Sequence, residues 1–391
     1  MSSNWNVVPF TEAVDICDTL RKPINSSERA SRIKGKEQSE LYPYYGATGQ
    51  VGFIDDYITD GEYVLLGEDG APFLDAFSKK AYIISGKTWV NNHAHVLKSK
   101  TNNKFLCYYL NSFNYKDYVS GTTRLKLTQA EMKRIPVPVP PLSEQERIVS
   151  RIEELFSQLD AGVETLKKTK AQLAVYRQAA ITEAFSVENN TPNVCLSDIA
   201  QIIGGITKGR DLSGTETIEL PYLRVANVQN GYLDLSEIKT IKLRVDEKER
   251  YLLKPGDVLY TEGGDRDKLG RGTVWRGEIK DCVHQNHIFK ARVDQSKAIP
   301  VYVALWSMST PARNYFYQKG KQSVNLASIN KTVLSALTLP LPALEKQREI
   351  INHIESRLSV CDSIEQTVDT ALQQAEAMRQ SILTQAFGGA L

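Results

Sequence analysis

The sequence predicts an α+β fold in which two mixed α/β domains, related by a pseudo-two-fold axis, are separated by a long antiparallel pair of helices forming a coiled coil. The segment from Pro140 to Phe185 recurs from Pro342 to Phe387 at a constant offset of 202 positions. In both copies apolar residues recur at spacings of three and four, which is typical of helices. The segments before the copies resemble each other only loosely. The predicted boundaries are 1–142 and 189–343 for the globular domains, and 143–188 and 344–391 for the helices.

The globular segments combine short strand-like runs with helix-like runs. We expect strands at Tyr63–Leu66, Tyr82–Ile84, Val258–Tyr260 and His287–Phe289, and helices at Asn103–Leu110 and Pro300–Ser307. Glycine-rich loops separate these runs, and each half closes on a polar, basic loop, at 121–126 and 319–325. Side chains of this kind contact phosphates and base edges, although a single such loop is more often a solvated turn.

Each repeated segment predicts one long helix. Prolines precede the first copy, and Ser143 with Glu146 has the spacing of a capping box. Gly162 and Thr169 interrupt an otherwise sustained heptad pattern. A helix of this length would span about 64 Å at 1.5 Å per residue, which exceeds the diameter of a small domain. Each helix therefore needs a partner, and the other copy, running antiparallel, is the simplest one.

Composition is that of an ordinary globular protein, with 41% hydrophobic and 24% charged residues among 391. No apolar run is long enough for a membrane span, and the N-terminus does not resemble a signal peptide. Five scattered cysteines predict free thiols and a cytoplasmic location. The net charge of only +2 is low for a protein that holds DNA alone, so any such binding needs local charge or help from partners.

Motifs for catalysis are weak. Gly86-Lys87-Thr88 fits a permissive phosphate-binding loop, but the residues around it look like strands and no helix follows. The pairs His93/His95 and His284/His287 lack a supporting thiol or carboxylate cluster, and we interpret them as neutral histidines at strand ends. We therefore expect no metal and no catalytic residues.

The motifs together carry a family resemblance. The first copy reads Ile-Pro-Val-Pro-Val-Pro-Pro-Leu-Ser-Glu-Gln-Glu-Arg-Ile over 135–148, and the second copy, from Pro342, is a degraded version of it. The segments 42–49, 61–70 and 89–95 also look like one class of target recognition domain. This arrangement, over essentially the whole chain, resembles the specificity subunit of type I restriction–modification enzymes.

That resemblance implies a non-catalytic DNA-reading subunit of a bacterial or archaeal cell. Each target recognition domain would read one half of an asymmetric, bipartite site in double-stranded DNA, and the helices would fix the spacer and dock two modification subunits. S-adenosylmethionine, ATP and Mg²⁺ would belong to the modification and restriction subunits, with no cofactor on this chain. The alternatives are the specificity subunit of a type IIB enzyme and a coiled-coil adaptor that does not touch DNA. An enzyme in its own right is the weakest alternative.

Two sets of candidate residues follow. The DNA-binding candidates are polar and basic residues of the loops: Tyr45, Thr48, Lys87, Asn91, Asn92, Arg124, Lys126, Lys208, Arg210, Arg224, Asn227, Arg266, Lys268, Gln285, Asn286, Lys319, Lys321, Gln322 and Asn325. The candidates for helix pairing or subunit docking are Ile148, Ile152, Leu155, Leu159, Leu166, Leu173, Ile350, Ile354, Ile364, Val368 and Met378.

Overall fold

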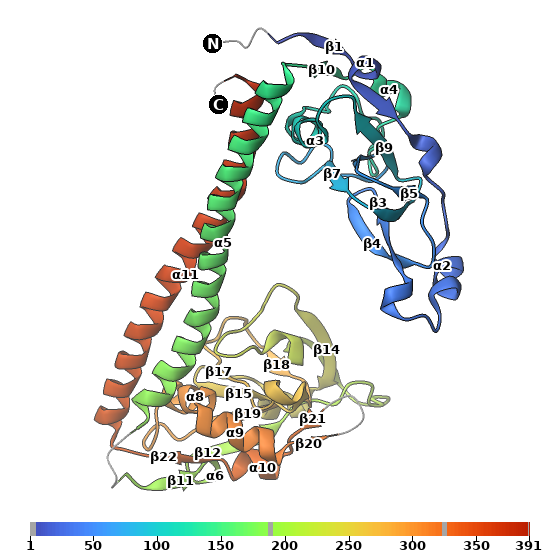
Figure 1. The fold of residues 1–391 in the computed structure, drawn as a ribbon. Helices are drawn as coiled ribbons and strands as arrows, with labels where there is room; N and C mark the ends of the chain where they lie inside the picture. Colours follow the sequence, from blue (N-terminus) through green and yellow to red (C-terminus); the bar gives the residue numbers. More distant parts are fainter. Residues whose placement is uncertain (1–4, 187–190, 323–326, 390) are drawn as a thin grey trace. The chain divides into compact units, whose positions relative to one another are not determined.

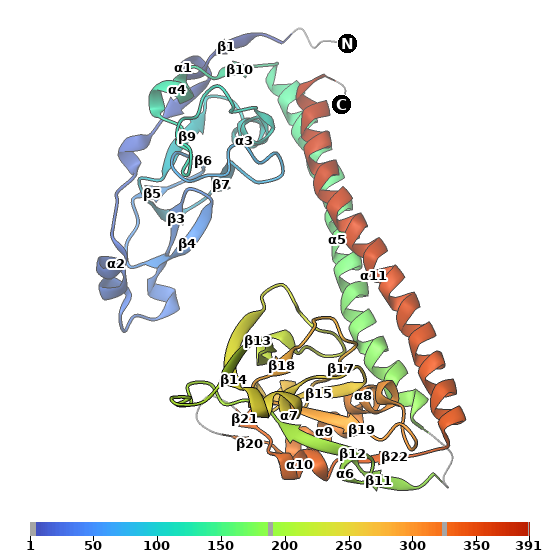
Figure 2. The ribbon, with the colours of Figure 1, turned by 180° about the vertical axis from the view of Figure 1, so that it is seen from behind.

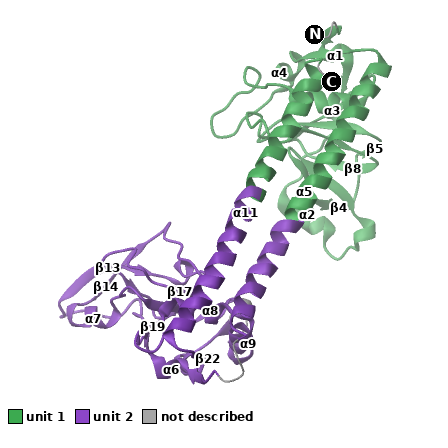
Figure 3. Cartoon of the chain, turned by 90° about the vertical axis from the view of Figure 1, so that its left-hand side faces the viewer, with its two compact units in different colours: residues 1–167, 368–391 green, residues 168–367 purple. Residues whose placement is uncertain are grey.

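The computed structural model describes residues 5–186, 191–322, 327–389 and 391, and leaves the side chains of Asp267 and Gln322 undescribed. It divides into two compact units (Figure 3): unit 1 comprises Met1–Lys167 and Val368–Leu391, and unit 2 comprises Lys168–Thr367. Each unit therefore contains one globular domain and a part of each long helix. The predicted α+β class is confirmed (Figures 1 and 2).

The globular domain of unit 1 contains two four-stranded sheets. The first has the order β2(Val14–Ile16)-β9(Ala94–Ser99)-β6(Tyr63–Gly67)-β7(Ala81–Ile84) and is antiparallel throughout. The second has the order β4(Gly49–Ile54)-β3(Tyr42–Gly46)-β8(Lys87–Val90)-β5(Thr59–Asp60), with β3 and β8 parallel. The strand β1(Val7–Pro9) pairs with β10(Pro136–Pro138), and the helices are α1(Phe10–Ala13), α2(Ser26–Ile33), α3(Asn103–Ser112) and α4(Gln129–Lys133).

Unit 2 repeats this topology. Its antiparallel sheet has the order β12(Ala200–Gly204)-β19(Ile288–Val293)-β15(Asp257–Thr261)-β17(Gly272–Val274). In its second sheet, β14(Lys239–Arg244)-β13(Thr217–Leu223)-β18(Val283–His284), the strands β13 and β18 are again parallel. β11(Asn193–Cys195) pairs with β22(Thr338–Pro340), and β16(Gly263–Gly264)-β21(Ala327–Ser328)-β20(Lys321–Gln322) form a small third sheet. The helices are α6(Leu196–Ile199), α7(Lys248–Tyr251), α8(Pro300–Met308), α9(Thr310–Lys319) and α10(Lys331–Ser335).

The core of each globular domain lies where one helix packs on the antiparallel sheet. In unit 1, Leu106 and Leu110 of α3 are buried against Val64 and Leu66 of β6. In unit 2, Tyr302 of α8 occupies the corresponding core. The predicted strands and helices of both halves are confirmed, with β19 beginning one residue later than expected. Short apolar runs bounded by glycine were therefore reliable signals here.

The long helices are α5(Leu142–Ala184) and α11(Leu344–Phe387). In unit 1 the start of α5 packs on the end of α11, with Ile152 buried beside Leu383. In unit 2 the end of α5 packs on the start of α11, where Ile181 is buried in one cluster with Ile354. The two helices therefore lie side by side and antiparallel within each unit (Figures 1 and 2), as predicted.

Two details of the helix prediction are wrong. Ser143 is not the N-cap, because α5 begins at Leu142 and the carbonyl of Pro141 accepts the first helical N–H groups, from Glu144 and Gln145. Ile364 and Met378 do not pair, because their side chains are 40% and 54% exposed. The seam of α11 instead uses buried residues at strict seven-residue spacing: Ile354, Cys361, Val368 and Ala375. On α5 the buried or half-buried partners include Ile148, Ile152, Leu155, Leu159, Leu166 and Leu173.

Candidate nucleic-acid interface

The two basic closing loops, one in each unit, are held by equivalent backbone hydrogen bonds. In unit 1 the N–H of Glu68, just after β6, donates to the carbonyl of His93, and the carbonyl of Glu68 accepts from Leu127 at the end of the loop. In unit 2 the N–H of Glu262, just after β15, donates to His287, and its carbonyl accepts from Ile329. The N···O distances are 2.8 and 2.7 Å in unit 1 and 2.9 and 2.8 Å in unit 2. The duplication therefore preserves how each loop is held while the side chains on it differ.

In unit 1 this loop borders an open hollow of about 740 Å³. The hollow is lined by backbone and small side chains from the β3–β4 turn, by Asp69 and Gly70, by Asn91 and His93, and by Arg124 of the closing loop. Among the predicted residues, Thr48, Asn91 and Arg124 meet here. The walls are mainly apolar with a few polar groups among them, and a hollow of this kind can receive the edge of a nucleotide base.

The other predicted residues of unit 1 lie around this hollow or beyond it. Lys126 is 50% exposed, with its ammonium 3.5 Å from a carboxylate oxygen of Glu68. Lys87 is exposed and lies over the ring of Tyr57, 4.6 Å from the ring centroid. Asn92 is exposed, whereas Tyr45 is half-buried and packs against Tyr82.

In unit 2 the predicted lysines are the most accessible candidates. Lys208, Lys319 and Lys321 are exposed, and none of them forms an ion pair with another described residue. Lys268 pairs with Asp265, and the guanidinium of Arg266 stacks 4.3 Å above the ring of Tyr317. Gln285 and Asn286 are half-buried, with backbone N–H groups bound to Leu223 and Ile206. Asn325 lies outside the described residues, as does the side chain of Gln322.

Three of the predicted DNA-binding residues have structural roles instead. Asn227 is 3% exposed, and its amide binds the carbonyls of Asp234 and Glu237 while its oxygen accepts from the N–H of Arg224. Arg210 forms a two-pronged pair with Glu247, both N···O distances being 2.9 Å. Arg224 binds the carbonyl and the carboxylate of Glu237. For these side chains the prediction is corrected, because Asn227 and the terminal nitrogens of Arg210 and Arg224 have partners within the domain, although the buried Nε of Arg224 has none among the described residues.

The fold explains why the phosphate-binding motif at 86–88 and the histidine pairs do not form a nucleotide or metal site. Gly86 is the turn between β7 and β8, so a strand and not a helix follows it, and no phosphate-binding loop forms. His284 is buried, and burial lowers its pKa to about 4, so it is neutral at pH 7 as predicted. His95 is buried between Asp18 and the carbonyl of Leu127. Within the described part of the chain, no cluster of three or more His, Cys, Asp or Glu side chains could hold a metal, and all five cysteines are free thiols.

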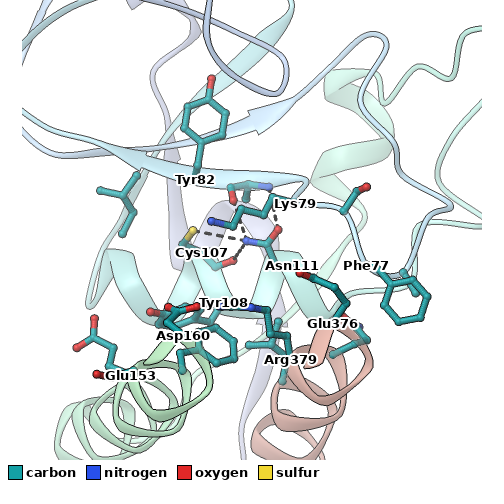
Figure 4. Close-up of a pocket in the computed structure, with 18 residues that line it drawn as sticks. Phe77, Lys79, Tyr82, Cys107, Tyr108, Asn111, Glu153, Asp160, Glu376 and Arg379 are labelled. Carbon is teal, nitrogen blue, oxygen red and sulfur yellow. Dashed lines mark hydrogen bonds and ion pairs between the residues drawn. The ribbon is translucent and has the colours of Figure 1, made fainter. Parts of the chain in front are cut away.

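A second hollow in unit 1, of about 990 Å³, lies between the globular domain and the long helices (Figure 4). Glu153 and Asp160 of α5 and Glu376 of α11 line it, together with Lys79 and Arg379. Three carboxylates against two cations disfavour a phosphate here. This hollow is therefore a poorer candidate for contact with DNA than the one beside Arg124.

A repeated buried glutamine fastens each long helix to its domain, and the sequence alone did not mark it as a structural residue. Gln145 donates to the carbonyl of Pro140 and accepts from the hydroxyl of Thr101, both at 2.9 Å. Gln347 donates to the carbonyls of Pro342 and Lys297 and accepts from the N–H of Ile299. The signal that could have revealed this is a polar residue within the apolar seam of a heptad.

Comparison with known protein families decides the identity of the fold. The family model described as the type I restriction modification DNA specificity domain matches residues 3–174 and again residues 189–374. The chain belongs to this family. The two matches correspond to the duplication, and each takes in one globular domain and much of the long helix that follows it.

The relatives agree with this assignment. The chain is 26% identical over 384 residues to a putative type I restriction enzyme specificity subunit of Haemophilus influenzae, covering 94% of this chain and 91% of the relative. It is 25% identical over 309 residues to the specificity subunit of the type I enzyme EcoKI of Escherichia coli, covering 73% and 65%. The type IIB and adaptor alternatives are not favoured by these relatives, and this chain is a type I specificity protein.

Solved structures share the fold. A chain from a study of complex assembly and conformational transition of the type I R-M system aligns with a TM-score of 0.69 and 17% identity, covering 100% of this chain and 99% of that one. The HsdS subunit from Thermoanaerobacter tengcongensis aligns with a TM-score of 0.52 and 16% identity, covering 100% and 98%. In the described residues, no helix has the length and apolar character needed to cross a membrane.

Proposed function

We propose that this chain is the sequence-reading subunit of a type I restriction–modification complex, and that each globular domain reads one half of a bipartite, asymmetric site in double-stranded DNA. The observation that carries this proposal is the closing loop. Glu68 and Glu262 hold the two loops with the same pair of backbone hydrogen bonds, yet the loops carry different side chains. A fixed frame with variable contacts is what reading two different half-sites requires.

Phosphate contacts would come from the exposed lysines. Lys87 in unit 1 and Lys208, Lys319 and Lys321 in unit 2 form no ion pair within the described residues. Such contacts position a protein on DNA without specifying the sequence. The low net charge of +2 then implies that partner subunits supply much of the remaining positive surface.

The long helices would set the spacer between half-sites and dock two modification subunits. Within unit 2, Val175 and Tyr176 of α5 and Val360 and Ile364 of α11 are large apolar side chains that remain exposed. Exposed apolar groups of this kind on a helix pair favour contact with another protein. Ile364 and Met378 thus remain docking candidates, although they do not pair the helices.

Catalysis would belong to the partners. In this proposal the modification subunits carry S-adenosylmethionine, and restriction subunits supply the chemistry that needs ATP and Mg²⁺. This chain would bind no cofactor and would act in the cytoplasm of a bacterial or archaeal cell, where the DNA is.

The test is a modification assay with the assembled complex on DNA mutated in either half of its site. Arg124→Ala and Lys321→Ala should each weaken modification in a way that depends mainly on one half-site, and on different halves. Equal effects of both substitutions on both halves would contradict the proposal.

A further inference from the structure

We propose that Arg124, held in place by Asp69, reads a guanine in the half-site of unit 1. This inference rests on the proposed function and adds a base and a positioning residue to it. Asp69 was not among the residues singled out from the sequence, because its partner lies far along the chain.

The ion pair between Asp69 and Nε of Arg124 leaves the two terminal nitrogens of the guanidinium available to a ligand. Nε of Arg124 lies 2.6 Å from Oδ1 of Asp69, and the arginine side chain is 60% exposed. No hydrogen bond within the described residues uses its two terminal nitrogens, Nη1 and Nη2. Two parallel N–H donors match the O6 and N7 acceptors of guanine in the major groove, which is the commonest base-specific contact of arginine.

Backbone hydrogen bonds also fix the chain on both sides of the Asp69–Arg124 ion pair. Gly70 has φ of +77°, and its N–H donates to the carbonyl of Leu125 at 3.0 Å. This positive φ favours glycine, and a Cβ at Gly70 would lie 3.2 Å from Nε of Arg124, so a larger residue would push the guanidinium away by a few tenths of an ångström. Ser120 and Lys126 exchange two backbone hydrogen bonds that close the loop. The arginine is therefore positioned before any ligand binds, which lowers the entropic cost of a contact.

The second carboxylate oxygen of Asp69 faces His93, whose Nδ1 lies 3.5 Å away. Asp69 thus lies between His93 and Arg124, and all three residues line the hollow. The hollow of about 740 Å³ is open to solvent beside the guanidinium. A base edge entering there would meet the guanidinium together with the exposed Thr48, whereas Asn91 is buried and its oxygen accepts from the N–H of His93.

Unit 2 has no counterpart of the Asp69–Arg124 ion pair at the equivalent position, although it keeps the backbone hydrogen bonds that hold the closing loop. Glu262 makes the same two backbone hydrogen bonds as Glu68, and the residue after it is Gly263, where unit 1 has Asp69. Gly263 has no carboxylate to pair with an arginine, so the Asp69–Arg124 ion pair has no equivalent at this position of unit 2. This contrast argues against a role in holding the loop, because the loop of unit 2 is anchored without it.

The experiment is genome-wide sequencing of modified bases in a host that carries the full complex with wild-type or substituted chain. We expect the wild-type motif to contain a guanine whose discrimination falls by about tenfold to a hundredfold in Arg124→Ala, the effect of losing a bidentate contact. Arg124→Gln should shift the preference at that position from guanine towards adenine, because glutamine pairs with N6 and N7 of adenine. Asp69→Asn, which keeps Arg124 in the sequence but removes the charge that holds its guanidinium, should weaken discrimination at the same position.

Lys116→Ala, at an exposed lysine of the same domain that is outside the candidate residues, is the matched control and should leave the motif unchanged. The inference is overturned if Arg124→Ala lowers modification equally at every site with an unchanged motif, which is the behaviour of a phosphate contact. It is also overturned if the relaxed position is not a guanine, or if Arg124→Gln leaves the preferred base unaltered. A wild-type motif that is bipartite would uphold the proposed function in each of these cases, whereas the absence of any bipartite motif would refute that function itself.

Discussion

Replacing Gln145 by alanine should loosen the attachment of α5 to the domain that precedes it. The side chain is 1% exposed and makes two hydrogen bonds, to the carbonyl of Pro140 and from the hydroxyl of Thr101. Each lost bond removes about 1 kcal/mol, and an unsatisfied buried partner adds about 1–3 kcal/mol. We therefore expect Gln145→Ala to lower the free energy of unfolding by about 3–5 kcal/mol, since two bonds are lost and one buried carbonyl, that of Pro140, is left unsatisfied.

The assay is urea unfolding followed by circular dichroism, with hydrogen exchange at the start of α5 as a local readout. Glu146→Ala is the matched control, because Glu146 is the next residue of the same turn and is exposed. That control should stay within about 0.5 kcal/mol of wild type. The equivalent Gln347→Ala, which loses three hydrogen bonds, should cost at least as much. If Gln145→Ala unfolds at the same urea concentration as the control, the glutamine does not fasten the helix.

Three further predictions concern the helices and pH. Inserting one heptad after Thr169 should lengthen the spacer of the modified motif, and an unchanged spacer in sequenced motifs would count against a role of the helices in spacing. Replacing Ile364 or Met378 by aspartate should reduce co-purification of the modification subunits while the thermal midpoint of the chain stays unchanged, since both side chains are exposed; full retention of the subunits would remove these residues from the docking surface. His284 has its pKa lowered to about 4 by burial, so the unfolded chain takes up a proton there near pH 6.5 before the folded chain does. The contribution of His284 to the free energy of unfolding should be fully present above pH 6.5, and about 2 kcal/mol of it should be lost by pH 5. Urea unfolding of His284→Asn should lack that part of the pH dependence. A pH profile identical to that of the wild type would contradict this prediction.

The helices could be predicted closely because their signal is local. Heptad spacing and the repeated Pro-rich start placed the first residues of α5 and α11 to within one residue, whereas both helices end four residues before the predicted boundaries, at Ala184 and Phe387. The exact seam was harder, since Ile364 has the right spacing but lies at the edge of the pair while Cys361 lies inside it. Apolar character alone does not distinguish these two positions.

The site was only partly predictable because its contacts are distant in sequence. The closing loop and Arg124 were identified from composition, but Asp69 acquires its role only when β6 brings it beside that loop. Asn227 was misassigned for the same reason: residue type suggested a base reader, while its hydrogen bonds to Asp234 and Glu237 make it a turn-holding residue. A polar side chain can be assigned to a ligand only after its partners within the fold are known.

The most direct test of the account is to sequence modified bases across the genome of a host with the intact gene and of the same host after deletion of the gene. We predict one gene-dependent motif made of two unlike half-sites separated by a fixed spacer of unspecified bases. A motif confined to a single half, or a modification pattern that does not change when the gene is removed, would contradict the claim that this chain reads two DNA sequences at a fixed distance.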